Sequence, residues 1–253
     1  MKKRPQKLEI LGVKIVNARK ERVLNKISAQ CSVLSTKMSN YRPFWVATAY
    51  SETFLEAQDN SEFAQAIEKA DWIVLDGVAG WMALDYPNQG LKVVLNALQG
   101  KYVDRPVGVE IFRELLEEGK LKFFLLGGFR GVAKRLAQKY NCEFEEQGPD
   151  QDRRILNKIN KYKPDILFVS YGRFKQEMWI AQNLDKLNCK VVVGVGSAFD
   201  EVAKEGVWKM PTPVWIQRMG LKWLWRGLHD AKHWKRIWKA VIIFPWRIYR
   251  YDK

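Results

Sequence analysis

The chain has 253 residues, a formal net charge of +15 and 47% hydrophobic residues, which excludes an intrinsically disordered chain and allows a buried core. The length suits one large α/β domain, or one domain with an appendage. Residues 1–30 carry a net charge of +7 and residues 201–253 carry +8, so residues 31–200 are neutral overall and a uniformly cationic protein is excluded.

Apolar, β-branched runs alternate with helical patterns along the chain. The strands are predicted at 8–16, 44–49, 72–75, 121–126, 165–171 and 191–195. The helices are predicted at 107–118, 132–140, 154–162 and 175–186. This alternation predicts an α/β fold with a mainly parallel, Rossmann-like sheet covered by helices. Residues 87–106 break the alternation, and we expect either a flexible active-site loop or an irregular insertion there.

The C-terminal part of the chain differs in character from the rest. It is helical in pattern from Val214 onward, and Pro245 is expected to end or kink the last helix. We therefore divide the chain into an α/β body, residues 1–205, and a basic amphipathic helical appendage, residues 206–253.

The appendage combines basic and aromatic residues, since seven of the eleven tryptophans lie after residue 200. Trp234 and Trp238 share one helical face, whereas Lys235 and Arg236 lie largely on the other. This mixture fits a nucleic acid, an anionic membrane interface where indoles lie at headgroup level, or a subdomain that packs its own aromatics. In the membrane interpretation these four residues are the contacts.

Cysteine usage and targeting patterns favour a reducing, cytoplasmic compartment. The three cysteines are far apart and show no CxxC spacing, which argues against a disulfide framework or a zinc site. The N-terminus is basic but has no apolar stretch of signal-peptide length. No apolar run approaches the ~18–20 residues that span a bilayer, so any membrane contact is expected to be peripheral.

Candidate site residues follow the predicted strands, because ligands of parallel sheets bind at the carboxyl ends of the strands. Asp76 follows the third strand and is either a general base or a helix cap. Gly127, Gly128 and Arg130 follow the fourth strand. They predict either a phosphate site at a helix N-terminus or an ordinary tight turn.

Two further strand ends carry polar residues. Gly172, Gln176 and Glu177 follow the fifth strand, where the amide and the carboxylate suit the hydrogen-bonding groups of a sugar or base, or are surface residues of a first helical turn. Gly196 and Asp200 follow the sixth strand. Glycine there permits close approach of a ligand, and the acid either binds a uracil or ribose edge or is a surface helix residue.

Metal and nucleophile patterns are weak. His229 and His233 have the i, i+4 spacing that can chelate zinc, but they lack a nearby third ligand and lie among basic residues that repel a cation. There is no DxD motif, and the element order suggests no Ser-His-Asp or Cys-His arrangement. We therefore expect no metal and no cofactor.

Several segments, in this order and spacing, resemble the WecG/TagA/CpsF family of bacterial glycosyltransferases, glycosyltransferase family 26. The resemblance covers roughly residues 8–240 and includes Thr48 after the second strand. The segments are DWIVLDGVAG, RPVGVEIFREL, FFLLGGFRGVAKRLA, PDILFVSYGRFKQEMWIAQN, VVVGVGSAFDEVAKEG and MPTPVWIQRMGLKWLWR.

The resemblance implies an inverting, metal-independent transferase at the inner face of the cell membrane. Such an enzyme moves an N-acetylhexosamine of the N-acetylmannosamine type from a UDP-sugar to a polyprenyl-diphosphate-linked acceptor, in teichoic-acid and related cell-surface polysaccharide biosynthesis. Asp76 matches the proposed catalytic base, which would deprotonate the acceptor hydroxyl. Thr48 and Gln176 match polar active-site positions.

Other positions extend the resemblance or depart from it. Asp200 matches a position near the nucleotide. Arg218 and Arg226 match the C-terminal segment that folds over the active site, where arginines would neutralise a diphosphate in the absence of a metal. Tyr50 stands where the family usually has asparagine, and Lys222 stands at a commonly acidic position.

Three functions stay open on the sequence alone. The leading one is the transferase, whose partners would be a UDP-sugar, a lipid-linked sugar and an anionic membrane surface, with no nucleic acid. The second is a nucleic-acid-binding or RNA-modifying α/β protein, although no RNP, KH or helix-turn-helix signature is present. The third is a homologue that has lost catalysis. The oligomeric state is also open, a homo-oligomer included.

Overall fold

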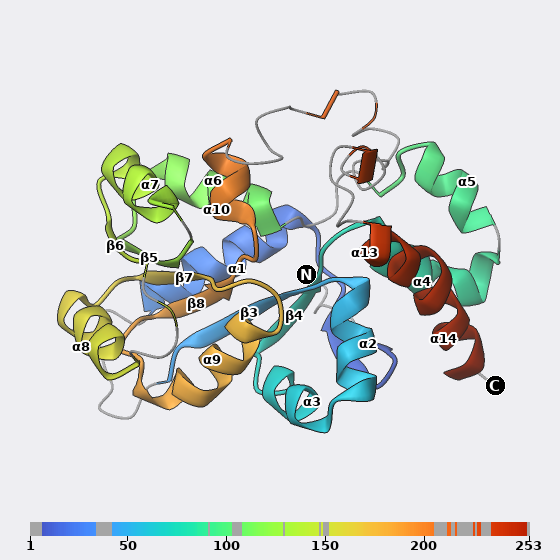
Figure 1. Cartoon of the computed structure of the whole chain (residues 1–253), viewed down its shortest axis with the longest axis horizontal. Coiled ribbons are helices and arrows are strands. Elements are labelled where there is room, and N and C mark those ends of the chain that lie inside the picture. The colour runs from blue at the N-terminus through green and yellow to red at the C-terminus, as the bar shows by residue number, and fades with distance from the viewer. Residues whose placement is uncertain are drawn as a thin grey trace.

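The computed structural model of the chain shows a parallel β-sheet between two layers of helices (Figure 1). The described residues are 7–33, 42–90, 92–102, 108–128, 130–146, 148, 152–204, 212–213, 216, 225, 227–228 and 234–251. The predicted α/β class is confirmed, because six strands pair in parallel in the order β4-β3-β8-β7-β5-β6.

The strands of this sheet agree closely with the apolar runs of the sequence. They are β3 (Phe44–Ala49), β4 (Trp72–Leu75), β5 (Phe123–Gly127), β6 (Glu143–Glu145), β7 (Ile166–Ser170) and β8 (Val191–Gly194). Every residue of β5, β7 and β8 is buried. Because helices cover both faces of the sheet, these strands are continuously apolar rather than alternating.

The helices pack in two layers, each with its own apolar cluster. The α-helices are α1 (Lys20–Val33), α2 (Ser51–Asp59), α3 (Ser61–Ile67), α4 (Val78–Gln89), α5 (Lys92–Leu98), α6 (Gly108–Glu118), α7 (Val132–Tyr140), α8 (Asp152–Tyr162), α9 (Lys175–Asn183), α10 (Ala198–Val202), α13 (Trp234–Trp238) and α14 (Phe244–Tyr251). The first layer contributes Phe54 of α2 and Trp179 of α9. The second contributes Phe112 of α6 and Phe199 of α10, whose rings stack at 5.0 Å.

Two strand predictions need correction. The single strand expected at 8–16 is a hairpin of β1 (Lys7–Ile10) and β2 (Val13–Val16), which pair antiparallel. The turn between them places Leu11 at φ 48° and Gly12 at φ 80°, so a glycine there makes the reversal possible. Strand β6 was not predicted, because three residues at a sheet edge with two glutamates carry no apolar pattern.

The described part of the 87–106 stretch is largely helical, so the expectation of a loop or irregular insertion there is wrong. Helix α4 continues to Gln89, and α5 begins at Lys92. Gly90, at φ 54°, separates the two helices. Gly90 therefore marks a helix junction in this stretch.

The tail, residues 234–251, runs as one helical segment that includes a π-helical stretch, η5 (Lys239–Ile243). Pro245 is the second residue of α14 and does not end the helix. Prolines and π-helical turns each interrupt the regular hydrogen-bond pattern of an α-helix. Phe244 is buried and stacks on Phe54 of α2 at 5.9 Å, which fixes the tail to the body. Among the described residues, no helix has the length and apolarity needed to cross a membrane.

Candidate active site

Thr48 and Asp76 lie together at the carboxyl ends of two neighbouring strands. Thr48 is in β3, and Asp76 follows β4 directly. Strands β3 and β4 pair in register, and the Asp76 N–H donates to the carbonyl of Ala49 at 2.8 Å. Both side chains are almost fully buried, with 1% and 7% exposure. The parallel register therefore brings together the hydroxyl and the carboxylate that the sequence singled out.

The N-terminus of α6 closes over this pair. The N–H of Gly108, the first residue of α6, donates to Asp76 Oδ2 at 3.0 Å. A Cβ atom at position 108 would lie 3.0 Å from Asp76 Oδ2 and 3.1 Å from Thr48 Cγ2, so glycine is required for this close approach. The N-cap residue of α4 is Gly77, so Asp76 is not the helix cap that the sequence offered as an alternative.

Thr48 connects this pair to β8 and α9. Its hydroxyl donates to the carbonyl of Gly194 at 3.0 Å. The Gln176 amide lies against Gly194, where an added Cβ would be 3.0 Å from Nε2. Gln176 is fully buried; its Oε1 accepts from the Gly196 N–H at 2.9 Å, and its Nε2 donates to Glu177 Oε1 at 2.8 Å. Through its hydrogen bond with the Gly196 N–H, Gln176 holds the turn after β8 in place.

Glu177 is a buried acid next to Gln176 whose pKa is strongly perturbed. It is only 4% exposed, and its Oε2 has no hydrogen-bond partner among the described residues. Burial raises the pKa of the Glu177 carboxyl to about 7, against the opposing effects of the Gln176 hydrogen bond and the charge of Arg173. The carboxyl therefore titrates near neutral pH, and it lies beneath the site rather than at its surface.

The position of the site in the sheet agrees with the general rule for open parallel sheets. After β3 the chain continues into α2 of the first helix layer, and after β8 it continues into α10 of the second. Since β3 and β8 are neighbours, their chain connections diverge to opposite faces. Ligands of such sheets bind at this switch point, outside the carboxyl ends of the strands.

The glycine turn after β5 is as tight as predicted. Gly127 has φ 90°, and a Cβ there would lie 2.6 Å from the carbonyl oxygen of Ser170 on β7. Gly128 has φ 77°, and a Cβ there would lie 3.1 Å from Phe199 of α10. Both glycines are thus required by the packing of the backbone, whatever else they do.

At the turn where the sequence predicts either a phosphate site or a tight turn, a carboxylate of the chain itself lies against the N-terminus of α7. Glu146 accepts from the N–H of Gly131 at 3.2 Å and from the N–H of Lys134 at 3.1 Å. These N–H groups are the ones that a phosphate would use. Arg130 is exposed, and its carbonyl accepts from Arg135. The tight-turn interpretation is the one that this geometry favours.

The remaining predicted positions lie around the same edge or outside the described residues. Gly172 and Gly196 adopt φ 83° and 55° in the turns after β7 and β8, and a Cβ at Gly196 would lie 3.3 Å from the Tyr50 hydroxyl. Asp200 is half-buried in the first turn of α10. The residues that fall outside the described part are Arg218, Arg226, His229 and His233.

An ion-pair cluster that sequence reasoning missed joins the site to the tail. Glu52, in the first turn of α2, pairs with Arg173 of the turn before α9 and with Arg236 of α13, the latter at 3.2 Å. The Glu52 side chain is only 11% exposed. Its partners are 121 and 184 residues away in sequence, so no local pattern signals the cluster. Arg236, predicted as a membrane contact, is therefore half-buried against the body.

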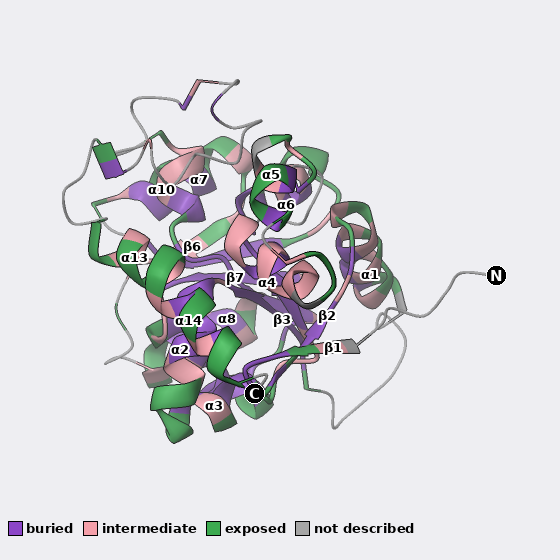
Figure 2. Cartoon of the chain, turned by 90° about the vertical axis from the view of Figure 1, so that its right-hand side faces the viewer, coloured by how far each residue is buried: buried purple, intermediate pink, exposed green. Residues whose placement is uncertain are grey.

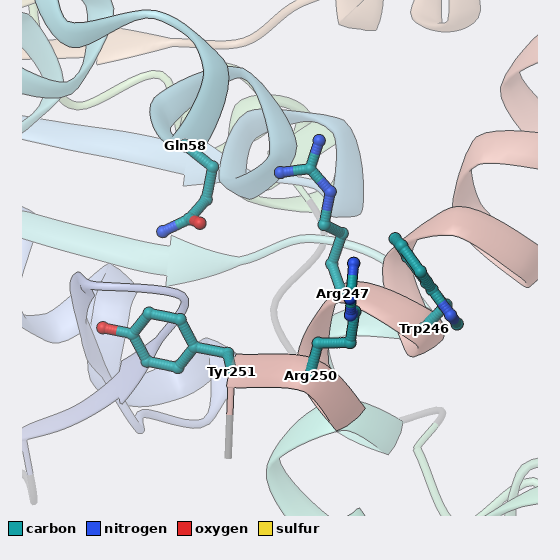
Figure 3. A pocket seen from close by; sticks show the side chains of 5 residues that line it. All are labelled: Gln58, Trp246, Arg247, Arg250 and Tyr251. Atoms are coloured by element: carbon teal, nitrogen blue, oxygen red, sulfur yellow. The ribbon is translucent and has the colours of Figure 1, made fainter. Parts of the chain in front are cut away.

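The other predicted membrane contacts are exposed. Trp234 and Trp238 are 49% and 61% exposed, and Lys235 is exposed as well. Beside them, a shallow hollow lies between the tail and α2 (Figure 3). Its lining residues are Gln58, Trp246, Arg247, Arg250 and Tyr251. None of these belongs to the Thr48–Asp76 site, and Arg247 is already paired with Asp59 at 2.9 Å.

Metal-ligating side chains do not gather at the site. In the part of the chain that the structure describes, no group of three or more His, Cys, Asp or Glu residues has the arrangement of a metal site. The free thiols of Cys31 and Cys189 are buried. What the described residues bring together is a buried hydroxyl and a carboxylate at a switch point, with a helix N-terminus above them.

Comparisons with known proteins identify the family of the chain. The Glycosyl transferase WecG/TagA/CpsF family matches residues 8–253. Relatives from Staphylococcus aureus strains MRSA252, MW2 and NCTC 8325 / PS 47 are 28%, 27% and 27% identical, over 96% of this chain and 92% of theirs. Each bears the name N-acetylglucosaminyldiphosphoundecaprenol N-acetyl-beta-D-mannosaminyltransferase. The chain belongs to the WecG/TagA/CpsF family of glycosyl transferases.

Proposed function

We propose that the protein transfers an N-acetylhexosamine of the N-acetylmannosamine type from a UDP-sugar to a polyprenyl-diphosphate-linked sugar, with inversion and without a metal. The names of the Staphylococcus aureus relatives support the sugar and the lipid-linked N-acetylglucosamine acceptor. Such an acceptor is anchored in a membrane, so the protein would work as a peripheral enzyme at the cytoplasmic face of the cell membrane.

The observation that carries the proposal is the meeting of Asp76 with Thr48 beneath the N-terminus of α6. A buried carboxylate at the carboxyl end of β4, beside the switch point between β3 and β8, is placed to act as a general base. The Gly108 N–H holds one oxygen of Asp76 at 3.0 Å, which orients the carboxylate. Gly108 also leaves no room for a side chain between the helix and the two polar groups.

In the proposed reaction, Asp76 takes the proton of the acceptor hydroxyl as its oxygen attacks the anomeric carbon of the donor. A new glycosidic C–O bond forms while the bond from the anomeric carbon to the UDP oxygen breaks, and UDP leaves with the bonding electrons. A single displacement of this kind inverts the anomeric configuration. Thr48 donates its hydroxyl proton to Gly194, so its oxygen can accept a further hydrogen bond from a substrate.

The departing diphosphate needs positive charge. In the proposal Arg218 and Arg226 supply it from the segment before the tail. Arg173, held by Glu52 in the turn before α9, is a further cation at the carboxyl edge of the sheet. A planar guanidinium group can bind two oxygens of one phosphate at once, which suits the UDP leaving group.

The experiment is a transfer assay with a panel of UDP-sugars and polyprenyl-diphosphate N-acetylglucosamine in excess EDTA. Mass spectrometry identifies the product, and NMR gives the configuration of the new linkage. The proposal expects one added N-acetylhexosamine, an inverted linkage and release of one UDP per transfer. Transfer that stops in EDTA and returns with a divalent cation would contradict the metal-independent mechanism. Absence of transfer with every donor, in protein that is folded, would contradict the activity.

A further inference from the structure

In the described part of the chain, the exposed large hydrophobic side chains are concentrated in two segments, α5 and the tail, residues 234–251. Apart from Leu228, every large hydrophobic residue that is exposed in this part of the chain comes from one of these two segments. Both segments lie on the right-hand side of Figure 1, and α5, α13 and α14 all face the viewer in Figure 2. An apolar surface confined to one side of a protein is typical of an interaction site.

Helix α5 presents aliphatic side chains to solvent as well as to the core, where Val93 is only 3% exposed. Its outward residues Val94 and Leu95 are 44% and 59% exposed. Its inward residue Asn96 is only 9% exposed, donates to Gln89 Oε1 at 2.5 Å and accepts from Lys101 Nζ at 2.6 Å. A helix facing water places its polar residues outward. Helix α5 instead satisfies its asparagine internally and presents aliphatic groups outward, which suits an apolar medium.

The charges of the two segments have one sign. Helix α5 contains no acid and begins with the exposed Lys92. Residues 234–251 contain five basic residues and no acid. Apolar side chains surrounded by lysine and arginine complement an anionic lipid surface, where the hydrophobic groups enter the interface and the cations meet the phosphates.

We propose that α5 is a second lipid-contacting element, which together with the tail, residues 234–251, seats the protein on an anionic bilayer. The inference rests on the proposed function only in taking a membrane as the place of work. Two separated contacts fix the orientation of a protein on a surface, whereas one contact leaves it free to rotate. Because α4 and α5 occupy the sequence between Asp76 and Gly108, docking of α5 also brings the membrane next to the segment that frames the site.

The test uses the full-length protein with Val94→Ser/Leu95→Ser and sedimentation with vesicles rich in phosphatidylglycerol. Loss of two half-exposed aliphatic contacts is expected to weaken binding about 30-fold, since each such group on its own changes the affinity about fivefold when it enters the interface. A circular-dichroism melt verifies that the variant folds. As matched charge variants, Lys92→Gln is expected to weaken binding about fivefold, whereas Lys186→Gln, at an exposed lysine before the amino end of β8, leaves it unchanged.

The outcomes separate this inference from the proposed function, because vesicle binding requires no sugar substrate. The double variant is expected to transfer sugar normally to an acceptor with a short, water-soluble alkyl chain. Wild-type affinity of the folded double variant for the vesicles would overturn the inference. So would equal effects of Lys92→Gln and Lys186→Gln. A double variant that binds vesicles normally but changes its oligomeric state in sedimentation velocity would assign the α5 face to a second copy of the chain instead.

Discussion

Glu177 gives a prediction whose size can be worked from the structure. The variant is Glu177→Gln, which keeps the shape of the side chain and an acceptor oxygen for Gln176. Burial raises the pKa of Glu177 from its ordinary value near 4.5 to about 7, so the folded protein holds a proton that the unfolded chain releases. In this interval the folded state binds more protons, and the Glu177 contribution to the free energy of unfolding falls as pH rises.

The magnitude follows from the two pKa values. Below pH 4.5 the carboxyl is neutral in both states, and it contributes no penalty. At pH 8 it is ionised in both states, and burial of the charge costs about 3 kcal/mol. Between pH 5 and pH 8 the loss is about 2–3 kcal/mol, and glutamine, which does not titrate, avoids it.

The assay is calorimetric unfolding of wild type and variant at pH 5 and pH 8. The melting temperature of Glu177→Gln relative to wild type should rise by about 5–10 °C between the two pH values. Glu117→Gln, at an exposed glutamate of α6, is the control and should show no such rise. A difference between variant and wild type that is the same at both pH values would refute the argument, because Glu177 would then ionise normally in the folded protein.

Two further substitutions test the packing around the site. Gly108→Ala should lower kcat about 10–100-fold, because the new methyl group would lie 3.0 Å from Asp76 Oδ2. The control is Gly148→Ala, which should have wild-type kinetics because no atom lies within 4 Å of the added methyl group. Equal kinetics for the two variants would contradict the close contact between Gly108 and Asp76. Glu52→Gln should destabilise the protein by about 2–3 kcal/mol in urea unfolding, since it unpairs two half-buried arginines. Asp59→Asn breaks the exposed ion pair with Arg247 and should lower the free energy of unfolding by under ~1 kcal/mol. A larger loss for Asp59→Asn than for Glu52→Gln would contradict the argument that the more buried ion pairs contribute more to stability.

The sequence predicted the sheet well because its strands are buried on both faces. Continuous apolar runs such as Val191–Gly194 leave little ambiguity about strand position. Predictions failed where the apolar pattern is absent or misleading. The edge strand β6 has two glutamates and therefore no apolar pattern. The hairpin turn at Leu11 lies within an apolar run, so the sequence shows no break there. The stretch around α5 appeared irregular, although its glycine only separates two helices.

The candidate site was predictable only in part, for a physical reason. Thr48 and Asp76 meet because neighbouring parallel strands end at the same edge, which is a rule of topology. The binding of Glu146 to the N-terminus of α7 depends on β6, which was not predicted. The Glu52 cluster depends on the path of the tail, and no spacing in the sequence encodes that path.

The most direct test of the central claim is the initial rate of sugar transfer by Asp76→Asn compared with wild type. Asparagine keeps an acceptor for the Gly108 N–H but cannot take a proton from the acceptor hydroxyl. With Asp76 as the general base, kcat should fall by about 10²–10⁴ while the affinity for UDP stays unchanged. Wild-type turnover by the folded variant would contradict the assignment of Asp76 as the base.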